Sequence, residues 1–108
     1  MTEFQHDRIT FNYNVVGEGR PFIFSHGLAW DLDRSRELLG HLPGHRLITW
    51  DMRAHGMTNP LGPAEALSFQ TFANDLAAFM DHLGIASAVI GGISLGAAVA
   101  LQFAADNP

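Results

Sequence analysis

Residues 92–96 read Gly-Ile-Ser-Leu-Gly, so a serine stands between two closely spaced glycines. An apolar, strand-like run at residues 86–90 comes before this motif, and an alanine-rich, helix-like run follows it. A serine on such a sharp strand-to-helix turn stands clear of the sheet, where its hydroxyl can act as a nucleophile. Gly92 and Gly96 remove side chains that would block the turn. The N-terminus of the following helix favours the negative charge that develops when Ser94 attacks a carbonyl carbon.

Two other interpretations of this stretch compete with that of a nucleophile. Residues 85–105 carry no charge, which is long enough for a membrane span. Gly92 and Gly96 also have the spacing found in helix pairs within lipid. Three glycines and two serines interrupt the run, however, and a strand, a turn and a helix explain all of it. Ser94 could also be a turn residue without chemistry in an ordinary globular domain.

Two more motifs follow short apolar runs upstream. Residues 22–24 lead into Ser-His-Gly-Leu, and residues 47–50 lead into Asp-Met-Arg-Ala-His-Gly-Met-Thr. Each apolar run predicts an inner strand of a parallel sheet. Open α/β sheets carry their chemistry just past the carboxyl ends of the strands. All three motifs are therefore expected at that edge of the sheet.

In order and spacing, the three motifs resemble the N-terminal part of an α/β-hydrolase-fold protein of the small esterase, lactonase and carbon–carbon hydrolase type. The resemblance implies that Ser94 is the catalytic nucleophile. It also implies an oxyanion hole made by the backbone N–H groups of Leu95 and Leu28. Haloalkane dehalogenases and epoxide hydrolases resemble the same scaffold but use aspartate in place of Ser94, so we set them aside. The matching segments are His26-Gly27, Asp51-x-Arg53-x-x-Gly56-x-Thr58 and Gly92-x-Ser94-x-Gly96.

The resemblance also implies supporting roles for residues around the serine. His26 is expected to hold the oxyanion loop through hydrogen bonds, and Gly27 lets the backbone turn tightly enough to aim the next amide. Asp51 and Arg53 are expected to be loop scaffolding behind the site. Arg53 could instead meet a substrate carboxylate.

The acyl pocket is expected to be lined by Leu28, Ala29 and Trp30. Ordinary core packing is an equally open interpretation of Trp30, because a tryptophan ring fills either environment. Neither a metal nor a cofactor is expected at the site.

A hydrolytic serine needs a base, and the base needs an orienting acid. In this fold both follow the serine in the chain. No histidine follows Ser94, and Asp106 is the only acid after it. His55, in a loop near the same edge of the sheet, is the least unfavourable substitute base, although it lies in the scaffold motif. We therefore expect residues 1–108 to be the incomplete N-terminal portion of a single domain, inactive and unstable as an isolated monomer.

The composition bounds the partners of the chain. Its formal net charge of −5 disfavours nucleic acid and anionic membranes. The lack of cysteine excludes disulfides and thiolate chemistry. Its first residues lack the basic and apolar regions of a signal peptide, so a cytoplasmic location is expected. The expected partners are a small acyl substrate and, where the missing residues lie on another polypeptide, a complementary chain that supplies the other strands and triad members.

The elements that must position these motifs follow an α/β order. Alternating residues at 9–16 predict a half-buried strand, paired with a shorter strand at 2–6. Strands and helices then alternate, which predicts a predominantly parallel sheet with flanking helices and right-handed crossovers. The strand that contains Val89 is expected at an exposed edge of this sheet, although both of its faces are apolar.

Capping residues predict three helices. The first starts at Asp31 or Asp33 and runs to about Leu39, and the third follows the serine and runs toward Asp106. On the second helix, between Ser68 and Gly84, Asp75 and Asp81 are expected to point to water. The expected core face of that helix consists of Phe69, Phe72, Ala73, Leu76, Met80 and Leu83.

The leading functional expectation is a serine hydrolase that acts on an ester, lactone, thioester or carbon–carbon bond beside a carbonyl. A second is acyl transfer, or cofactor-free peroxidation through a peracid, at the same residues. A third belongs to another class, namely a non-enzymatic ligand-binding protein on the same fold. Each depends on whether Ser94 is reactive.

Overall fold

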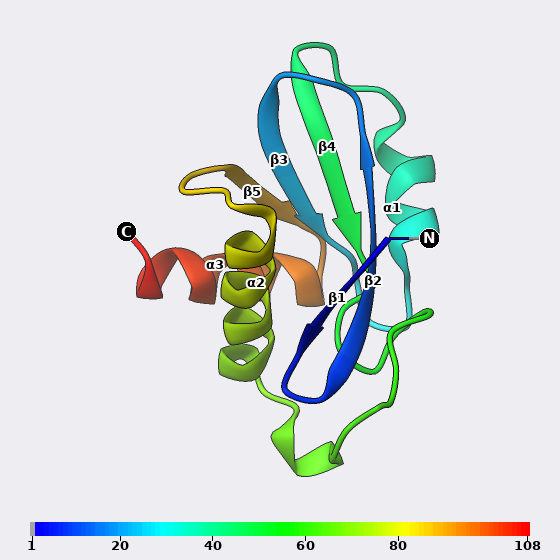
Figure 1. The fold of residues 1–108 in the computed structure, drawn as a ribbon, viewed down its shortest axis with the longest axis vertical. Helices are drawn as coiled ribbons and strands as arrows, with labels where there is room; N and C mark the ends of the chain where they lie inside the picture. The colour runs from blue at the N-terminus through cyan, green and yellow to red at the C-terminus, as the bar shows by residue number, and fades with distance from the viewer. Residues whose placement is uncertain (1) are drawn as a thin grey trace.

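The computed structural model describes residues 2–108, which form one mixed sheet flanked by helices. The expected α/β fold is confirmed (Figure 1). The strands are β1 (Thr2–His6), β2 (Ile9–Val16), β3 (Arg20–Ser25), β4 (His45–Trp50) and β5 (Val89–Gly92). The helices are α1 (Leu32–Leu39), α2 (Phe69–Leu83) and α3 (Leu95–Asp106), with a short 3-10 turn, η1 (Ala64–Ala66).

The five strands lie in the order β1-β2-β4-β3-β5. The first two form an antiparallel hairpin, and β2 is also antiparallel to β4. The turn of the hairpin is made by Asp7 and Arg8, which both have positive φ, the conformation that tight hairpin turns need. By contrast, β3 is parallel to both β4 and β5. The three strands that carry the motifs are thus parallel, and their carboxyl ends meet at one edge.

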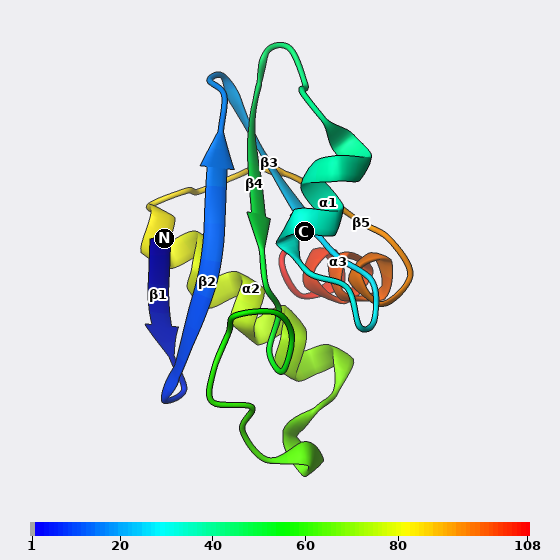
Figure 2. The same cartoon turned by 90° about the vertical axis from the view of Figure 1, so that its right-hand side faces the viewer.

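The chain reverses its direction across the sheet at β3. It steps from β3 to β4 on one side through α1, and returns past β3 to β5 through α2. Right-handed crossovers in opposite directions put their helices on opposite faces. Accordingly α1 covers one face, while α2 and α3 pack together on the other (Figures 1 and 2). Such a reversal leaves a crevice outside the carboxyl ends of the strands, where open α/β proteins bind ligands.

Aromatic rings fill the space between the sheet and α2. Phe4 stacks on both Phe11 and Phe79, with 4.8 Å between ring centroids in each pair. Trp50 lies 5.3 Å from Phe79. Phe79 is fully buried although it was not among the residues expected on the core face, and Phe69, which was, is 54% exposed. Phe69 is the first residue of α2, and its side chain borders an open hollow at the surface instead of the core.

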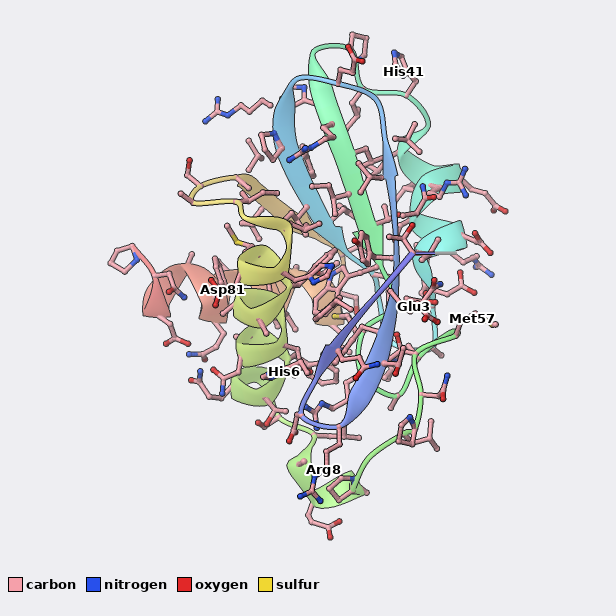
Figure 3. All side chains as sticks on the ribbon, viewed as in Figure 1. Glu3, His6, Arg8, His41, Met57 and Asp81 are labelled. Carbon is pink, nitrogen blue, oxygen red and sulfur yellow. The ribbon has the colours of Figure 1, made fainter. Side chains whose placement is uncertain are left out.

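Asp75 is the clearest error of the sequence-based expectations. It was expected to point to water, yet it is fully buried. It lies three residues after Phe72 and four before Phe79, so helical geometry turns it to the same face as those two rings. A buried carboxylate is tolerated there because Arg53 pairs with it. Asp81, labelled in Figure 3, is exposed as expected.

The apolar run at residues 86–90 becomes strand only from Val89 onward. Within residues 2–108, β5 pairs with β3 alone, so it forms an edge of the sheet, as expected. Its residues are half-buried rather than buried. The uncharged stretch at 85–105 is divided among this strand, a turn and the twelve-residue α3. In the part of the chain that is described, no helix combines the length and apolarity that crossing a membrane would require.

Candidate active site

Ser94 joins β5 to α3 in a backbone conformation that residues other than glycine rarely adopt. Its φ is 54° and its ψ is −116°, and it is the N-cap residue of α3. Its hydroxyl makes no capping hydrogen bond, and the residue is exposed. Residues other than glycine are held at positive φ only where the surrounding structure enforces it, and such positions cluster at functional sites. The turn therefore presents an uncommitted hydroxyl at the start of a helix.

The two flanking glycines let this turn pack closely against the sheet. A Cβ on Gly96 would collide with the carbonyl group of Ser25 at the end of β3. A Cβ on Gly92 would collide with the carbonyl group of Gly96. Both positions therefore require the absence of a side chain, for reasons of space rather than of backbone angle. The close approach fixes the first turn of α3 against the end of β3.

The loop after β3 lies directly against Ser94. A Cβ built on Gly27 would stand 3.6 Å from the Cβ of Ser94. The backbone N–H of Ile93 donates to the carbonyl of Ser25 over 3.2 Å, which joins the two loops. The backbone N–H groups of Leu28 and Leu95 donate none of the turn, loop and cap hydrogen bonds between backbone groups in residues 2–108. One uncommitted amide, that of Leu95, thus follows Ser94 directly, and the other, that of Leu28, belongs to the loop that lies against the serine.

His26 connects the loop after β3 to the loop after β4. Its Nδ1 lies 2.7 Å from the carbonyl oxygen of Gly27, and its Nε2 lies 2.9 Å from the backbone nitrogen of Met52. A carbonyl only accepts, so Nδ1 carries the hydrogen, and Nε2 accepts from Met52. The ring is therefore neutral, and burial lowers the pKa of His26. One buried ring thus joins the loop after β3 to the loop after β4.

Asp51 organises the loop after β4. Its carboxylate accepts the backbone N–H of Leu32 over 2.8 Å and that of Met57 over 2.9 Å. It also accepts from the side-chain amide of Asn12 over 2.9 Å. Gly56 has φ 52°, and a Cβ there would collide with the same carboxylate. Asp51 therefore connects β2, the start of α1 and its own loop.

Arg53 is held inside the molecule by two carboxylates. Its Nε and Nη2 each donate to one oxygen of Asp75 over 2.9 Å, and Nη2 also donates to Asp7 over 2.8 Å. These hydrogen bonds, chiefly with Asp75, raise the pKa of Arg53. Burial raises the pKa of Asp75, which Arg53 opposes, and the hydrogen bond from Arg53 lowers that of Asp7. His6, labelled in Figure 3, lies 3.5 Å from the same Asp75 carboxylate.

The alternative that Arg53 meets a substrate carboxylate gains no support from this geometry. The side chain is 1% exposed, its Nε and Nη2 are engaged by Asp75 and Asp7, and its Nη1 is buried without a partner among residues 2–108. Its partners lie on α2 and in the β1–β2 turn, so the pair connects three elements. The interpretation of Arg53 as scaffolding agrees with these contacts.

An apolar hollow of about 490 Å³ opens beside the two uncommitted amides. Trp30 does not line the hollow. Its ring instead lies under the guanidinium of Arg34, whose Cζ is 5.1 Å from the centroid of the tryptophan ring. The first turn of α2 contributes to the hollow, which the sequence alone did not indicate. The lining consists of Leu28, His55, Leu67, Ser68, Phe69, Phe72 and Leu95.

His55 borders this hollow, but its ring is already oriented by the loop. Nδ1 lies 2.8 Å from the carbonyl oxygen of Arg53, and the ring centroid lies 4.8 Å from that of His26. No group of three or more histidine, aspartate or glutamate side chains in residues 2–108 is arranged to hold a metal ion. At the carboxyl ends of the parallel strands, the described groups that could take part in a reaction are the Ser94 hydroxyl, the two uncommitted amides and the His55 ring.

Comparisons with known proteins agree with this architecture. Residues 20–108 match the family described as alpha/beta hydrolase fold. AB hydrolase superfamily protein YisY of Bacillus subtilis is 32% identical over 105 residues, which are 94% of this chain and 38% of that protein. The non-heme haloperoxidase of Rhodococcus erythropolis is 34% identical over 99 residues, covering 88% of this chain and 35% of that enzyme.

Among solved structures, Est816, described as an N-acyl homoserine lactone degrading enzyme, matches with a TM-score of 0.86 at 28% identity. The match covers 99% of this chain and 41% of Est816. This chain therefore spans less than half the length of the proteins that it matches. The family match at residues 20–108 includes all three motifs and the three parallel strands β3, β4 and β5 that carry them. The chain belongs to the alpha/beta hydrolase fold family.

Proposed function

We propose that Ser94 is the nucleophile of a hydrolase that forms an acyl-enzyme with an ester, a lactone, a thioester or a ketone whose adjacent carbon–carbon bond is cleaved. The observation that supports this most is the state of the Ser94 hydroxyl. It is exposed, makes no capping hydrogen bond and is held at φ 54° by the close packing of Gly92 and Gly96. A residue that served only as a helix cap would gain from an extended backbone and a capping bond.

In the proposed reaction, Oγ of Ser94 attacks the carbonyl carbon, and the carbonyl oxygen becomes an oxyanion. The N–H groups of Leu28 and Leu95 donate hydrogen bonds to this oxyanion. Removal of one such donor raises the activation barrier by about 3–4 kcal/mol in other enzymes. The proton of Ser94 passes to a base. We propose that this base and its orienting acid lie outside residues 1–108, because Nδ1 of His55 is engaged by a carbonyl and no carboxylate in residues 2–108 accepts from it.

The hollow beside Leu28 and Leu95 is the proposed site of the organic group next to the scissile carbonyl. Its volume of about 490 Å³ suits a small molecule. Its lining is largely apolar, which favours a substrate with a hydrocarbon portion.

A fluorophosphonate probe applied to the intact protein tests this function, because such probes react with activated serines. We expect one adduct, on the peptide that contains Ser94, and its loss in Ser94→Ala. Ser68→Ala is the matched control, since Ser68 is also the N-cap of a helix and also borders the hollow. Absence of an adduct on Ser94, under conditions that label a known serine hydrolase, would refute the proposal and favour a ligand-binding protein.

Peracid formation at the same serine is a second candidate, favoured by the similarity to the non-heme haloperoxidase of Rhodococcus erythropolis. In this reaction hydrogen peroxide, instead of water, would attack the acyl-enzyme and release a peracid. Bromide-dependent bromination of monochlorodimedone in acetate with hydrogen peroxide would measure it. A rate that exceeds ester hydrolysis and disappears in Ser94→Ala would favour this candidate over simple hydrolysis.

A further inference from the structure

The lining of the apolar hollow contains two polar side chains, His55 and Ser68. The hydroxyl of Ser68 is already engaged at the start of α2. It accepts the backbone N–H of Thr71 and contacts the hydroxyl of the same residue, each over 3.0 Å. The second ring nitrogen of His55 has no such commitment. Among the lining side chains, His55 therefore carries the one polar atom that is free to meet a ligand.

The orientation of the His55 ring determines what that atom can recognise. A carbonyl oxygen accepts the hydrogen of Nδ1, so the neutral ring presents Nε2 as an acceptor. In residues 2–108, Nε2 makes no side-chain hydrogen bond and is not among the buried, unpartnered atoms. Both nitrogens of the neighbouring His26 are occupied by Gly27 and Met52, so His26 cannot satisfy it.

The scaffold fixes this ring before any ligand arrives. The carbonyl that holds Nδ1 belongs to Arg53, whose guanidinium is locked by Asp75. The ring also packs against His26 and against Phe72, whose centroid is 6.4 Å away. A fixed acceptor in an apolar hollow is the arrangement by which small-molecule sites select orientation and identity.

We propose that Nε2 of His55 accepts a hydrogen bond from a hydroxyl or amide N–H group on the acyl portion of the substrate. The site then prefers acyl groups that carry such a donor over plain hydrocarbon acyl groups. This inference rests on the proposed function, since the hollow adjoins the amides assigned to the oxyanion. A site built around a hydrogen bond discriminates against analogues that lack the donor, because its own polar group is left unpaired.

Matched substrates test the preference in the intact protein. Methyl hexanoate is compared with the isomeric methyl hydroxyhexanoates that carry one hydroxyl at successive carbons. For the best isomer, we expect kcat/KM to exceed that of methyl hexanoate by about tenfold or more. His55→Phe should reduce this ratio to about one, whatever its effect on the absolute rate with methyl hexanoate. His55→Gln, which retains an acceptor oxygen, should keep part of the preference.

His41→Phe is the control, because His41 is exposed and labelled in Figure 3 far from the first turn of α2. It should leave the ratio unchanged. If His55→Phe does not fold, the ratio in His55→Gln and His55→Leu decides the matter. A wild-type ratio near one for every isomer, or a ratio that persists undiminished in His55→Phe or His55→Leu, would overturn the inference.

The two proposals fail in different ways. If Ser94 is labelled and plain esters are hydrolysed without a hydroxyl preference, only the role of His55 is refuted. If Ser94 is not labelled, the proposed function fails as well. In that case binding of hexanoic and hydroxyhexanoic acids, measured by calorimetry on the wild-type protein and on His55→Phe, still tests His55. Equal affinities of the two acids would refute it, and a preference lost in the variant would support it.

Discussion

Two helices on the same face of the sheet have a serine as their N-cap residue. The two serines differ in backbone conformation and in whether the hydroxyl is hydrogen-bonded. Ser68 has an extended backbone, with φ −153°, and its oxygen accepts the N–H of Thr71. Ser94 has φ 54° and caps nothing. The first serine stabilises its helix, as N-cap residues do. The second leaves both its hydroxyl and the first amide of α3 without partners.

The two helices are also held to the sheet in different ways. In the middle of α2, Asp75 reaches the loop after β4 through its ion pair with Arg53. The first turn of α3 is held by backbone contact, where Gly96 lies against the carbonyl of Ser25. Side chains set the position of α2, while the lack of a side chain sets that of α3. The closer contact is the one that holds the candidate nucleophile.

The largest expected difference between the two serines is in turnover. Ser94→Ala should lower kcat by about a million-fold, because removal of a catalytic serine has that effect in a characterised triad enzyme. Ser68→Ala should leave kcat within a few-fold and lower the free energy of unfolding by about 1 kcal/mol. Steady-state kinetics and urea unfolding of the intact protein measure both. A similar loss of turnover in the two variants would remove the distinction between them.

The anchor of α2 should give the largest change in stability. Asp75→Asn leaves the guanidinium of Arg53 buried with only its contact to Asp7, and we expect a loss of about 3–5 kcal/mol in the free energy of unfolding. Asp81→Asn, on the exposed side of the same helix, should change it by less than about 0.5 kcal/mol. Urea denaturation followed by circular dichroism measures both. Equal effects would show that the buried pair is not an anchor.

The contact of Gly96 with Ser25, which holds α3 to the sheet, should be weakened by the addition of a single methyl group. Gly96→Ala forces a Cβ into the carbonyl of Ser25, and we expect a loss of about 3 kcal/mol together with weaker probe labelling of Ser94. Gly84→Ala is the control, because Gly84 has φ 68° but no atom lies within 4 Å of its added Cβ. Its loss should be about 1 kcal/mol, from backbone strain alone, with labelling intact. The reverse order of losses would contradict the steric interpretation.

Replacement by glycine should change the stability at the two serines in opposite directions. Ser94→Gly relieves the positive φ and should raise the free energy of unfolding by about 1 kcal/mol while abolishing turnover. Ser68→Gly removes a capping oxygen from an unstrained position and should lower it by a few tenths of a kcal/mol. Differential scanning calorimetry of both variants measures the signs. A loss of stability in Ser94→Gly would mean that the turn stores no strain.

The smallest expected effect concerns the histidine that holds the loop beside Ser94. Burial lowers the pKa of His26 below its ordinary value of 6.5, so the unfolded chain binds a proton at a pH where the folded chain does not. The contribution of His26 to stability is thus complete above pH 6.5 and declines as the pH falls from there toward the lowered value. Unfolding free energies measured across this range should show a slope that His26→Gln reduces. His41→Gln should keep the slope, and an unchanged slope in His26→Gln would contradict the assignment.

Local signals predicted much of this molecule. Ser68 and Gly84 marked the ends of α2 correctly, and α1 follows Asp31, one of its two candidate caps, because capping depends on the few residues around a terminus. The alternation at residues 9–16 and the apolar run at 47–50 marked two strands for the same kind of reason. The motifs also indicated which loops meet, since parallel strands bring their carboxyl ends to one edge.

The errors fall where a residue interacts with an element far away in the chain. Asp75 was expected in water because an isolated acid on a helix is usually solvated. Its partner Arg53 lies on the loop after β4, 22 residues earlier. A local sequence pattern does not predict an ion pair between residues so far apart in the chain. Phe69 and Leu67 likewise became part of the hollow only because the start of α2 lies near the loop that carries His55.

By itself, the sequence determined the order of strands and helices, the places where helices begin and end, and the serine that stands between two glycines. These features depend on the periodicity of apolar residues, on helix capping and on the backbone conformations that each residue type allows. All three act over a few residues. The tertiary structure alone decided that Asp75 is buried, that Gly96 lies against Ser25, and that His55 borders an apolar hollow. Those outcomes depend on which distant surfaces pack together, and packing is settled by the whole chain at once.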